Sequence, residues 1–97
     1  MSQVIWSPAA LADVKRLHKF LQSKDPVAAR EAVKSIRQSV RILAHKPEIG
    51  RPVDDMSIEF REWLTDFGRS GYVVLYRYDA TETVILAVRH QKEVGYS

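Results

Sequence analysis

The chain has no cysteine, few histidines and no long apolar run. Without cysteine it can form neither a disulfide framework nor a thiolate zinc site, and it has no thiol nucleophile. Its three histidines are scattered rather than spaced as in HExxH sites, so we expect no metal and no cofactor. No apolar run approaches the ~20 residues of a membrane span. Residues 1–8 also lack the basic and apolar regions of a signal peptide. These absences favour a cytoplasmic protein.

The length predicts a single domain over residues 1–97, and the charge is unevenly distributed along it. Residues 1–50 carry nine Lys or Arg against four Asp or Glu, whereas residues 51–97 carry six against eight. A basic half can attract nucleic acid or an acidic protein partner. A solvated helical surface has the same composition, so charge alone leaves these alternatives open.

The first half predicts a short strand followed by two helices. A strand over residues 3–6 ends at Ser7-Pro8, where Ser7 can cap a helix whose first position is Pro8. Asp25-Pro26 repeats this arrangement and starts a second helix. Because almost nothing separates the two helices, they must form an antiparallel hairpin. The apolar residues at helical spacing are Leu11, Val14, Leu17 and Leu21 in the first helix, which runs through about Lys24, and Ala29, Val33, Ile36, Val40 and Leu43 in the second.

The second half predicts a loop and three strands. Two prolines and a glycine make residues 44–57 a long loop. Strands follow over residues 58–67, 72–78 and 83–89, and their short turns make them antiparallel neighbours. The last strand is apolar enough to be central. We therefore predict an α+β domain of order β-α-α-β-β-β, with the helical hairpin packed on one face of a small antiparallel sheet.

Two groups of polar residues are candidates for function. Four cations at helical spacing form a basic stripe on the second helix: Arg30, Lys34, Arg37 and Arg41. This stripe can face a phosphate backbone or an acidic peptide, or simply keep the helix soluble. The second group lies in or beside the three strands: Arg61, Tyr72, Tyr76, Arg77, Arg89, His90 and Tyr96. Alternation along the middle strand places Arg77 on the face of Val73 and Leu75, and we expect the helices to bury that face near one edge.

Several short motifs, taken in order, resemble one family. They are Ser7-Pro8-Ala9-Ala10 with Asp13, Asp25-Pro26-Val27-Ala28-Ala29, Lys46-Pro47-Glu48-Ile49-Gly50-Arg51-Pro52, Arg61-Glu62, Tyr72-Val73-Val74-Leu75-Tyr76-Arg77, and Val84-Ile85-Leu86-Ala87-Val88-Arg89-His90. Together they resemble the RelE/ParE superfamily of toxins from bacterial toxin–antitoxin systems. The resemblance runs nearly end to end and agrees with the β-α-α-β-β-β order.

The RelE-like branch of this superfamily implies a ribosome-dependent messenger RNA endonuclease. Cleavage there requires an activated 2′-hydroxyl, a protonated leaving oxygen and cations that stabilise the phosphorane. The chain departs from this pattern: Val73 and Gln91 stand where RelE-like toxins carry arginine. If it is an RNase, the remaining catalytic candidates are Arg61, Arg77, Arg89, His90 and Tyr96, with His90 and Tyr96 as acid and base.

The ParE-like branch fits these departures better, because it implies a non-catalytic inhibitor of DNA gyrase. The candidates for partner binding are then the basic stripe and the C-terminal segment of residues 89–97, including Arg89, His90 and Tyr96. Either branch implies a cognate ParD-like or RelB-like antitoxin that forms a hetero-oligomer with the toxin. An acidic antitoxin segment would be drawn to the basic half. A third reading is a small adaptor or nucleic-acid-binding domain without toxic activity.

Overall fold

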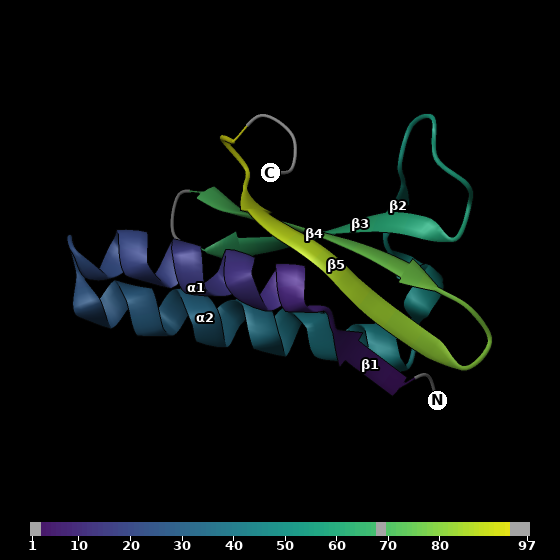
Figure 1. Cartoon of the computed structure of the whole chain (residues 1–97), viewed down its shortest axis with the longest axis horizontal. Coiled ribbons are helices and arrows are strands. Elements are labelled where there is room, and N and C mark those ends of the chain that lie inside the picture. The colour runs from purple at the N-terminus through teal and green to yellow at the C-terminus, as the bar shows by residue number, and fades with distance from the viewer. Residues whose placement is uncertain (1–2, 68–69, 94–97) are drawn as a thin grey trace.

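The computed structural model describes residues 3–67 and 70–93 of the chain. Two helices lie side by side against one face of a sheet (Figure 1). The elements in chain order are strand β1 (Gln3–Trp6), helices α1 (Pro8–Gln22) and α2 (Pro26–Val40), 3₁₀ turns η1 (Arg41–Ala44) and η2 (Pro47–Ile49), and strands β2 (Arg51–Pro52), β3 (Phe60–Phe67), β4 (Ser70–Tyr78) and β5 (Glu82–His90). This confirms the α+β class and the predicted order of elements.

Both predicted helix starts are confirmed by side-chain caps. The Ser7 hydroxyl accepts a hydrogen bond from the Ala10 amide at 3.1 Å. The Asp25 carboxylate accepts two, from the amides of Val27 and Ala28, each at 3.1 Å. Each cap is followed by proline at the first helical position. Proline lacks an N–H, but an N–H at this position would have no partner within the helix, so no hydrogen bond is lost. The α-helical geometry of α2 ends at Val40, and the chain tightens into η1.

The sheet is mixed, so the prediction of an antiparallel sheet was wrong for one strand. The strand order is β1-β5-β4-β3-β2. The neighbours β5–β4, β4–β3 and β3–β2 are antiparallel, whereas β1 pairs parallel with β5. Short turns determine only the directions of β3, β4 and β5. The direction of β1 depends instead on how the chain runs from β1 through the helical hairpin before it enters the sheet again.

The helices cover the face of the sheet that carries Tyr72, Val74 and Tyr76. These residues form one buried cluster with Ile36 and Leu43. Trp63 on β3 anchors α2 to this face, because its indole Nε1 donates a hydrogen bond to the Ser39 carbonyl at 3.0 Å.

The expectation that the helices bury the Arg77 face was wrong. Arg77 pairs with Phe60 and Val84, and it shares the opposite face with Val73 and Leu75. Alternation identifies which residues share a face but not which face the helices cover.

Within residues 3–67 and 70–93, no helix is both long enough and apolar enough to cross a membrane.

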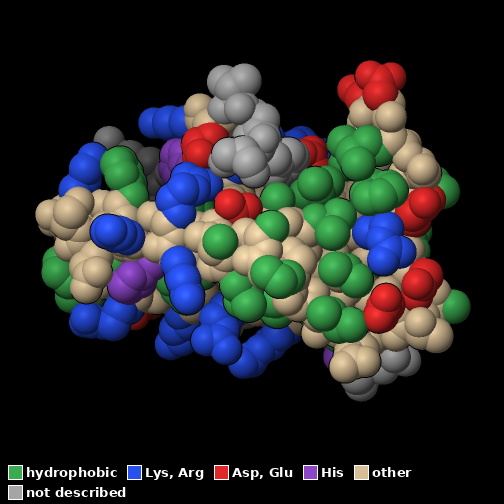
Figure 2. Space-filling view, in the orientation of Figure 1, with side chains coloured by type: hydrophobic (Ala, Val, Ile, Leu, Met, Phe, Trp, Pro, Cys, Tyr) green, Lys and Arg blue, Asp and Glu red, His purple; other side chains and the backbone are tan. Residues whose placement is uncertain are grey.

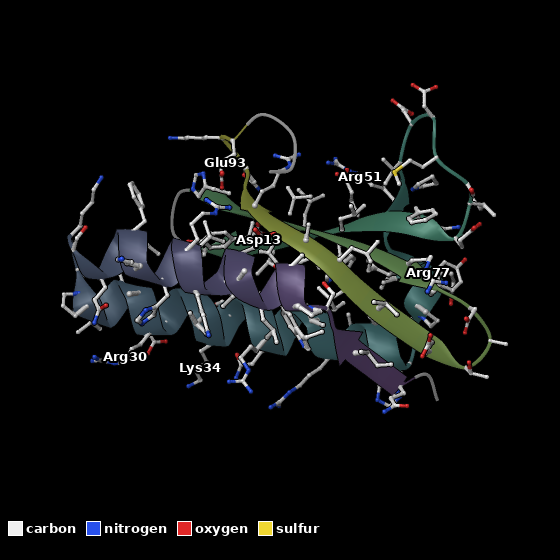
Figure 3. All side chains as sticks on the ribbon, in the orientation of Figure 1. Asp13, Arg30, Lys34, Arg51, Arg77 and Glu93 are labelled. Carbon is white, nitrogen blue, oxygen red and sulfur yellow. The ribbon has the colours of Figure 1, made fainter. Side chains whose placement is uncertain are left out.

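A bulge in β5 is held by the start of α1. The pairing with β4 shifts between Leu75 and Tyr76, which leaves Leu86 outside the ladder. The Ser7 hydroxyl donates to the Leu86 carbonyl at 3.3 Å. The carboxylate of Asp13, which is labelled in Figure 3, accepts from the Val88 amide at 2.9 Å. These bonds give side-chain partners to two backbone groups of β5 at and just after the bulge. The motif residues Ser7 and Asp13 therefore join α1 to the central strand.

Candidate functional site

The four cations of the basic stripe are all exposed: Arg30, Lys34 and Arg37 lie on α2, and Arg41 is the first residue of η1. Arg30 and Lys34 extend from α2 away from the sheet (Figure 3), and Figure 2 shows Lys and Arg side chains gathered along the helices. In the part of the chain that the structure describes, none of the four forms an ion pair. Surface cations are commonly offset by nearby carboxylates, so an unpaired row of four presents a strong positive field to an anionic partner.

Arg61 and Tyr76, by contrast, hold the loop that contains Gly50. The Arg61 guanidinium donates to the carbonyls of Glu48 and Gly50 at 2.9 and 2.8 Å. The Tyr76 hydroxyl donates to the Pro47 carbonyl at 2.6 Å and accepts from the Gly50 amide at 2.9 Å. Burial raises the pKa of the Tyr76 phenol, so the hydroxyl stays protonated at neutral pH. Both side chains therefore serve to position residues 47–50.

Arg89 and His90 close the C-terminal end of β5 together with Glu93. The Glu93 carboxylate accepts from the His90 amide at 2.8 Å and pairs with Arg16 of α1 at 3.1 Å. His90 Nδ1 accepts from the Lys92 amide at 3.1 Å, and the Arg89 guanidinium donates to the Glu93 carbonyl at 2.9 Å. Partial burial raises the pKa of Glu93. The hydrogen bond from the His90 amide and the charge of Arg16 together lower this pKa by more than burial raises it, so it lies below its usual value.

The RNase candidates are distributed over the sheet rather than gathered. Arg61 pairs with Tyr76 on the helix-covered face, and Arg77 lies on the opposite face. His90 pairs with Tyr72, four residues along β4 from Tyr76, which corresponds to about 13 Å at strand spacing. Tyr96 lies outside the described residues. The structure therefore brings His90 close to Arg89, but neither of them to Arg61 or Arg77.

The open face of the sheet is apolar at its centre. Val73 lies there between Leu64 and Arg89, next to Leu75. Figure 2 shows hydrophobic side chains gathered over the strands, with acidic groups around them. At the margin, Arg51 of β2 pairs with Glu62 of β3 at 3.0 Å. Val73 itself is buried, with only 2% of it exposed, so this position is covered by its neighbours and does not face solvent.

Sequence reasoning missed several residues that shape these regions. Asp13 stood within a motif but was given no role, because its partner Val88 lies 75 residues away. Glu93 was not singled out within residues 89–97, and its ion-pair partner Arg16 is similarly distant in the chain. Gly50 stood within a motif, and its position in the loop was the available signal. Among residues 3–67 and 70–93, no three His, Cys, Asp or Glu side chains are grouped as a metal site would require.

Comparisons with known proteins agree on one superfamily. Residues 4–95 match the family described as the ParE toxin of the type II toxin–antitoxin system parDE. The chain is 33% identical to Toxin RelE3 of Caulobacter vibrioides over 93 aligned residues. The alignment spans 96% of this chain and 98% of that protein. A chain in the solved structure of the chromosomal ParDE toxin–antitoxin system from P. aeruginosa has the same fold. The two superpose with a TM-score of 0.75 at 21% identity, over 93% of this chain and 96% of that chain.

Proposed function

This chain belongs to the ParE toxin family of type II toxin–antitoxin systems, within the RelE/ParE superfamily, and from that membership we propose that it inhibits DNA gyrase. A type II toxin has a protein antitoxin as its partner. The proposed toxin traps the complex of gyrase with cleaved DNA, blocks replication and acts without catalysis of its own. Because gyrase works on the bacterial chromosome, the proposed compartment is the cytoplasm.

The main support for this proposal is that the groups that RNA cleavage would need lie far apart on the sheet. A ribonuclease must place a base, an acid and phosphate-binding cations around one phosphate, within hydrogen-bonding reach. Here Arg61 is bound to loop carbonyls, and Arg77 lies on the other face of the sheet. Removing a single charge-stabilising donor can lower a rate by about 10²–10³-fold, so a site without several of them would be a poor catalyst.

The basic stripe, which runs along α2 to the first residue of η1, is the surface we assign to the gyrase–DNA complex. DNA is a polyanion, and four exposed cations without ion-pair partners in the described part of the chain would be attracted to it. Arg89 and His90 are less available for this role, because both hydrogen-bond within the turn that ends β5.

The test is a supercoiling assay with purified gyrase, ATP and relaxed plasmid, with and without this protein. We expect supercoiling to stop and cleaved DNA to accumulate. Reversing the four stripe charges to glutamate should abolish inhibition. Reversing four other exposed cations, Lys15, Lys19, Lys24 and Lys46, makes the same change in net charge and should leave inhibition intact. Normal supercoiling with the wild-type protein would refute the proposal.

The second candidate function is messenger RNA cleavage on the ribosome. It is favoured by the relative named Toxin RelE3, to which this chain is 33% identical. A translating ribosome mixture run beside the gyrase assay separates the two functions. Cleaved messenger together with normal supercoiling would establish the second candidate and make Arg61, Arg77 and His90 the first residues to substitute.

A further inference from the structure

Two exposed isoleucines lie just beyond the end of the basic stripe. Ile42 follows Arg41 directly in η1, and Ile49 is the last residue of η2. Their exposed fractions are 37% and 40%. The two turns contact each other, and the backbone of Lys46 links them. Its amide donates to the Ile42 carbonyl at 2.9 Å, and its carbonyl accepts from the Ile49 amide at 3.1 Å. This isoleucine pair therefore adjoins the cationic surface.

The loop that carries Ile49 is held more firmly than an ordinary surface loop. The side chains of Arg61 and Tyr76 make four hydrogen bonds to the backbone of residues 47–50. A rigid segment loses little conformational entropy when a partner covers it, so less of its binding energy is offset. Among these four residues Ile49 is the exposed apolar one. It is therefore the apolar contact that this rigid loop offers to a partner.

A second apolar pair has the opposite electrostatic setting. Met56 and Ile58 are 42% and 63% exposed, in the segment between β2 and β3. They directly follow Asp54 and Asp55, whose side chains are also exposed. Those carboxylates repel a polyanion, whereas the isoleucine pair lies beside cations that attract one. Met56 and Ile58 therefore serve as a matched control for the isoleucine pair.

The stripe and the isoleucine pair need different kinds of partner surface. Phosphates can pair with the four cations, but they give an exposed isoleucine no apolar surface on which to be buried. An apolar patch of a protein provides that burial and gives the cations nothing. Both surfaces occur side by side where a protein holds DNA. The gyrase–DNA complex assigned to the stripe above is such a partner.

We propose that the isoleucine pair docks on an apolar patch of the gyrase protein while the basic stripe lies along the DNA that gyrase holds. The inference rests on the proposed function and adds the reason why the toxin recognises the complex. The stripe needs DNA, and burial of the isoleucines needs protein. Because both contacts form on one rigid body, the second forms at a high effective concentration once the first is made.

The test uses two double variants that leave the net charge unchanged. Ile42→Ser with Ile49→Ser removes the isoleucine pair, and Met56→Ser with Ile58→Ser removes two side chains that are at least as exposed. Fluorescently labelled protein is titrated with a DNA duplex, with gyrase, and with gyrase bound to that duplex. We expect the wild type to bind the gyrase–DNA complex at least about tenfold more tightly than the duplex alone.

The isoleucine variant should bind the gyrase–DNA complex about fivefold or more weakly than the wild type, because two apolar side chains are no longer buried. Its affinity for the duplex alone should change less than about twofold, since phosphate contacts do not involve isoleucine. The control variant should match the wild type in both titrations and in the supercoiling assay. Leucine at positions 42 and 49 should restore most of the affinity. Thermal melts of all these variants should match the wild type.

Salt distinguishes the two contacts. Reversing the four stripe charges should reduce the salt dependence of binding to the gyrase–DNA complex, because fewer counterions are released from DNA. The isoleucine variant should keep the salt dependence of the wild type, because apolar burial releases no counterions.

Each other result overturns a defined part of the proposal. Equal weakening in the control variant would show that any exposed apolar side chain contributes. Weaker binding of the duplex alone by the isoleucine variant would identify DNA as the surface that the isoleucines contact. Full gyrase inhibition by the isoleucine variant would overturn this inference and leave the proposed function standing. A wild-type protein that does not inhibit gyrase would refute the proposed function, and the docking of the isoleucine pair on gyrase with it.

Discussion

We expect the hydroxyl of Tyr76 to contribute a large share of the free energy of unfolding of this protein. Tyr76 is fully buried, and its hydroxyl bridges the Pro47 carbonyl at 2.6 Å and the Gly50 amide at 2.9 Å. Tyr76→Phe keeps the ring and removes only the oxygen. The substitution therefore tests one pair of hydrogen bonds without creating a large cavity.

The expected loss can be worked from the two groups left behind. A buried donor or acceptor without a partner costs about 1–3 kcal/mol. The Gly50 amide is buried, whereas Pro47 is only half-buried and its carbonyl can recover some hydration. We therefore expect Tyr76→Phe to lower the free energy of unfolding by about 2–4 kcal/mol. At about 4–8 °C per kcal/mol for a domain of this size, Tm should fall by at least about 8 °C.

Tyr78→Phe is the matched control, two residues along the same strand. The two rings are neighbours with centroids 6.3 Å apart. Within residues 3–67 and 70–93 the Tyr78 hydroxyl has no hydrogen-bond partner. Its removal should change stability by no more than about 0.5 kcal/mol. Urea unfolding of both variants, followed by tryptophan fluorescence, gives the comparison directly. A shift in midpoint with an unchanged slope would indicate a pure stability effect.

Two results would refute this reasoning. Equal stability of Tyr76→Phe and Tyr78→Phe would show that the bridge to the loop contributes nothing. A Tyr76→Phe protein with wild-type stability but no toxicity would assign the hydroxyl to target recognition or chemistry instead of the fold. Toxicity that falls only in proportion to the amount of folded protein would support the structural role.

Three further predictions concern the same supporting contacts. Gly50→Ala should destabilise by about 1–3 kcal/mol, because the new Cβ would lie 2.5 Å from the Tyr76 hydroxyl oxygen; a double-mutant cycle with Tyr76→Phe should be non-additive, and strict additivity would count against the clash. Asp13→Ala should cost about 1–3 kcal/mol in chemical denaturation by leaving the Val88 amide unbonded, with partial rescue by Asn, and equal stability of all three proteins would contradict this. The pKa of Glu93 is lowered in the folded state, so its contribution is present at neutral pH and lost as pH falls below about 4.5; Glu93→Gln should reduce the loss of Tm on acidification, and an unchanged pH profile would argue against the pair with Arg16.

Much of the local structure could be predicted because its causes are local. Ser7-Pro8 and Asp25-Pro26 each place a side-chain acceptor directly before a proline, and both helices begin there. The three strands of the second half followed from alternation and short turns, and they occur within two residues of the predicted limits. The spacing of the basic stripe also required only the helical period.

Side-chain roles were less predictable, because a residue type allows several roles and the partner decides among them. Arg61 and Tyr76 were grouped with candidates for chemistry, and both bind the loop around Gly50. Leu11 was assigned to the apolar face of the first helix, yet it is 49% exposed while Ala10 is fully buried. The apolar stripe of α1 is wider than the surface that α2 and β5 cover.

The sequence by itself thus determined the helical hairpin, the strands and the positions of the cations, since each follows from neighbours in the chain. Only the tertiary structure decided that β1 runs parallel to β5, that the helices cover the Tyr76 face, and that the edge of β1 lies beside Arg37 and Arg41. These features join segments more than 30 residues apart. They arise from how the hairpin packs on the sheet, and no local period or turn encodes that packing.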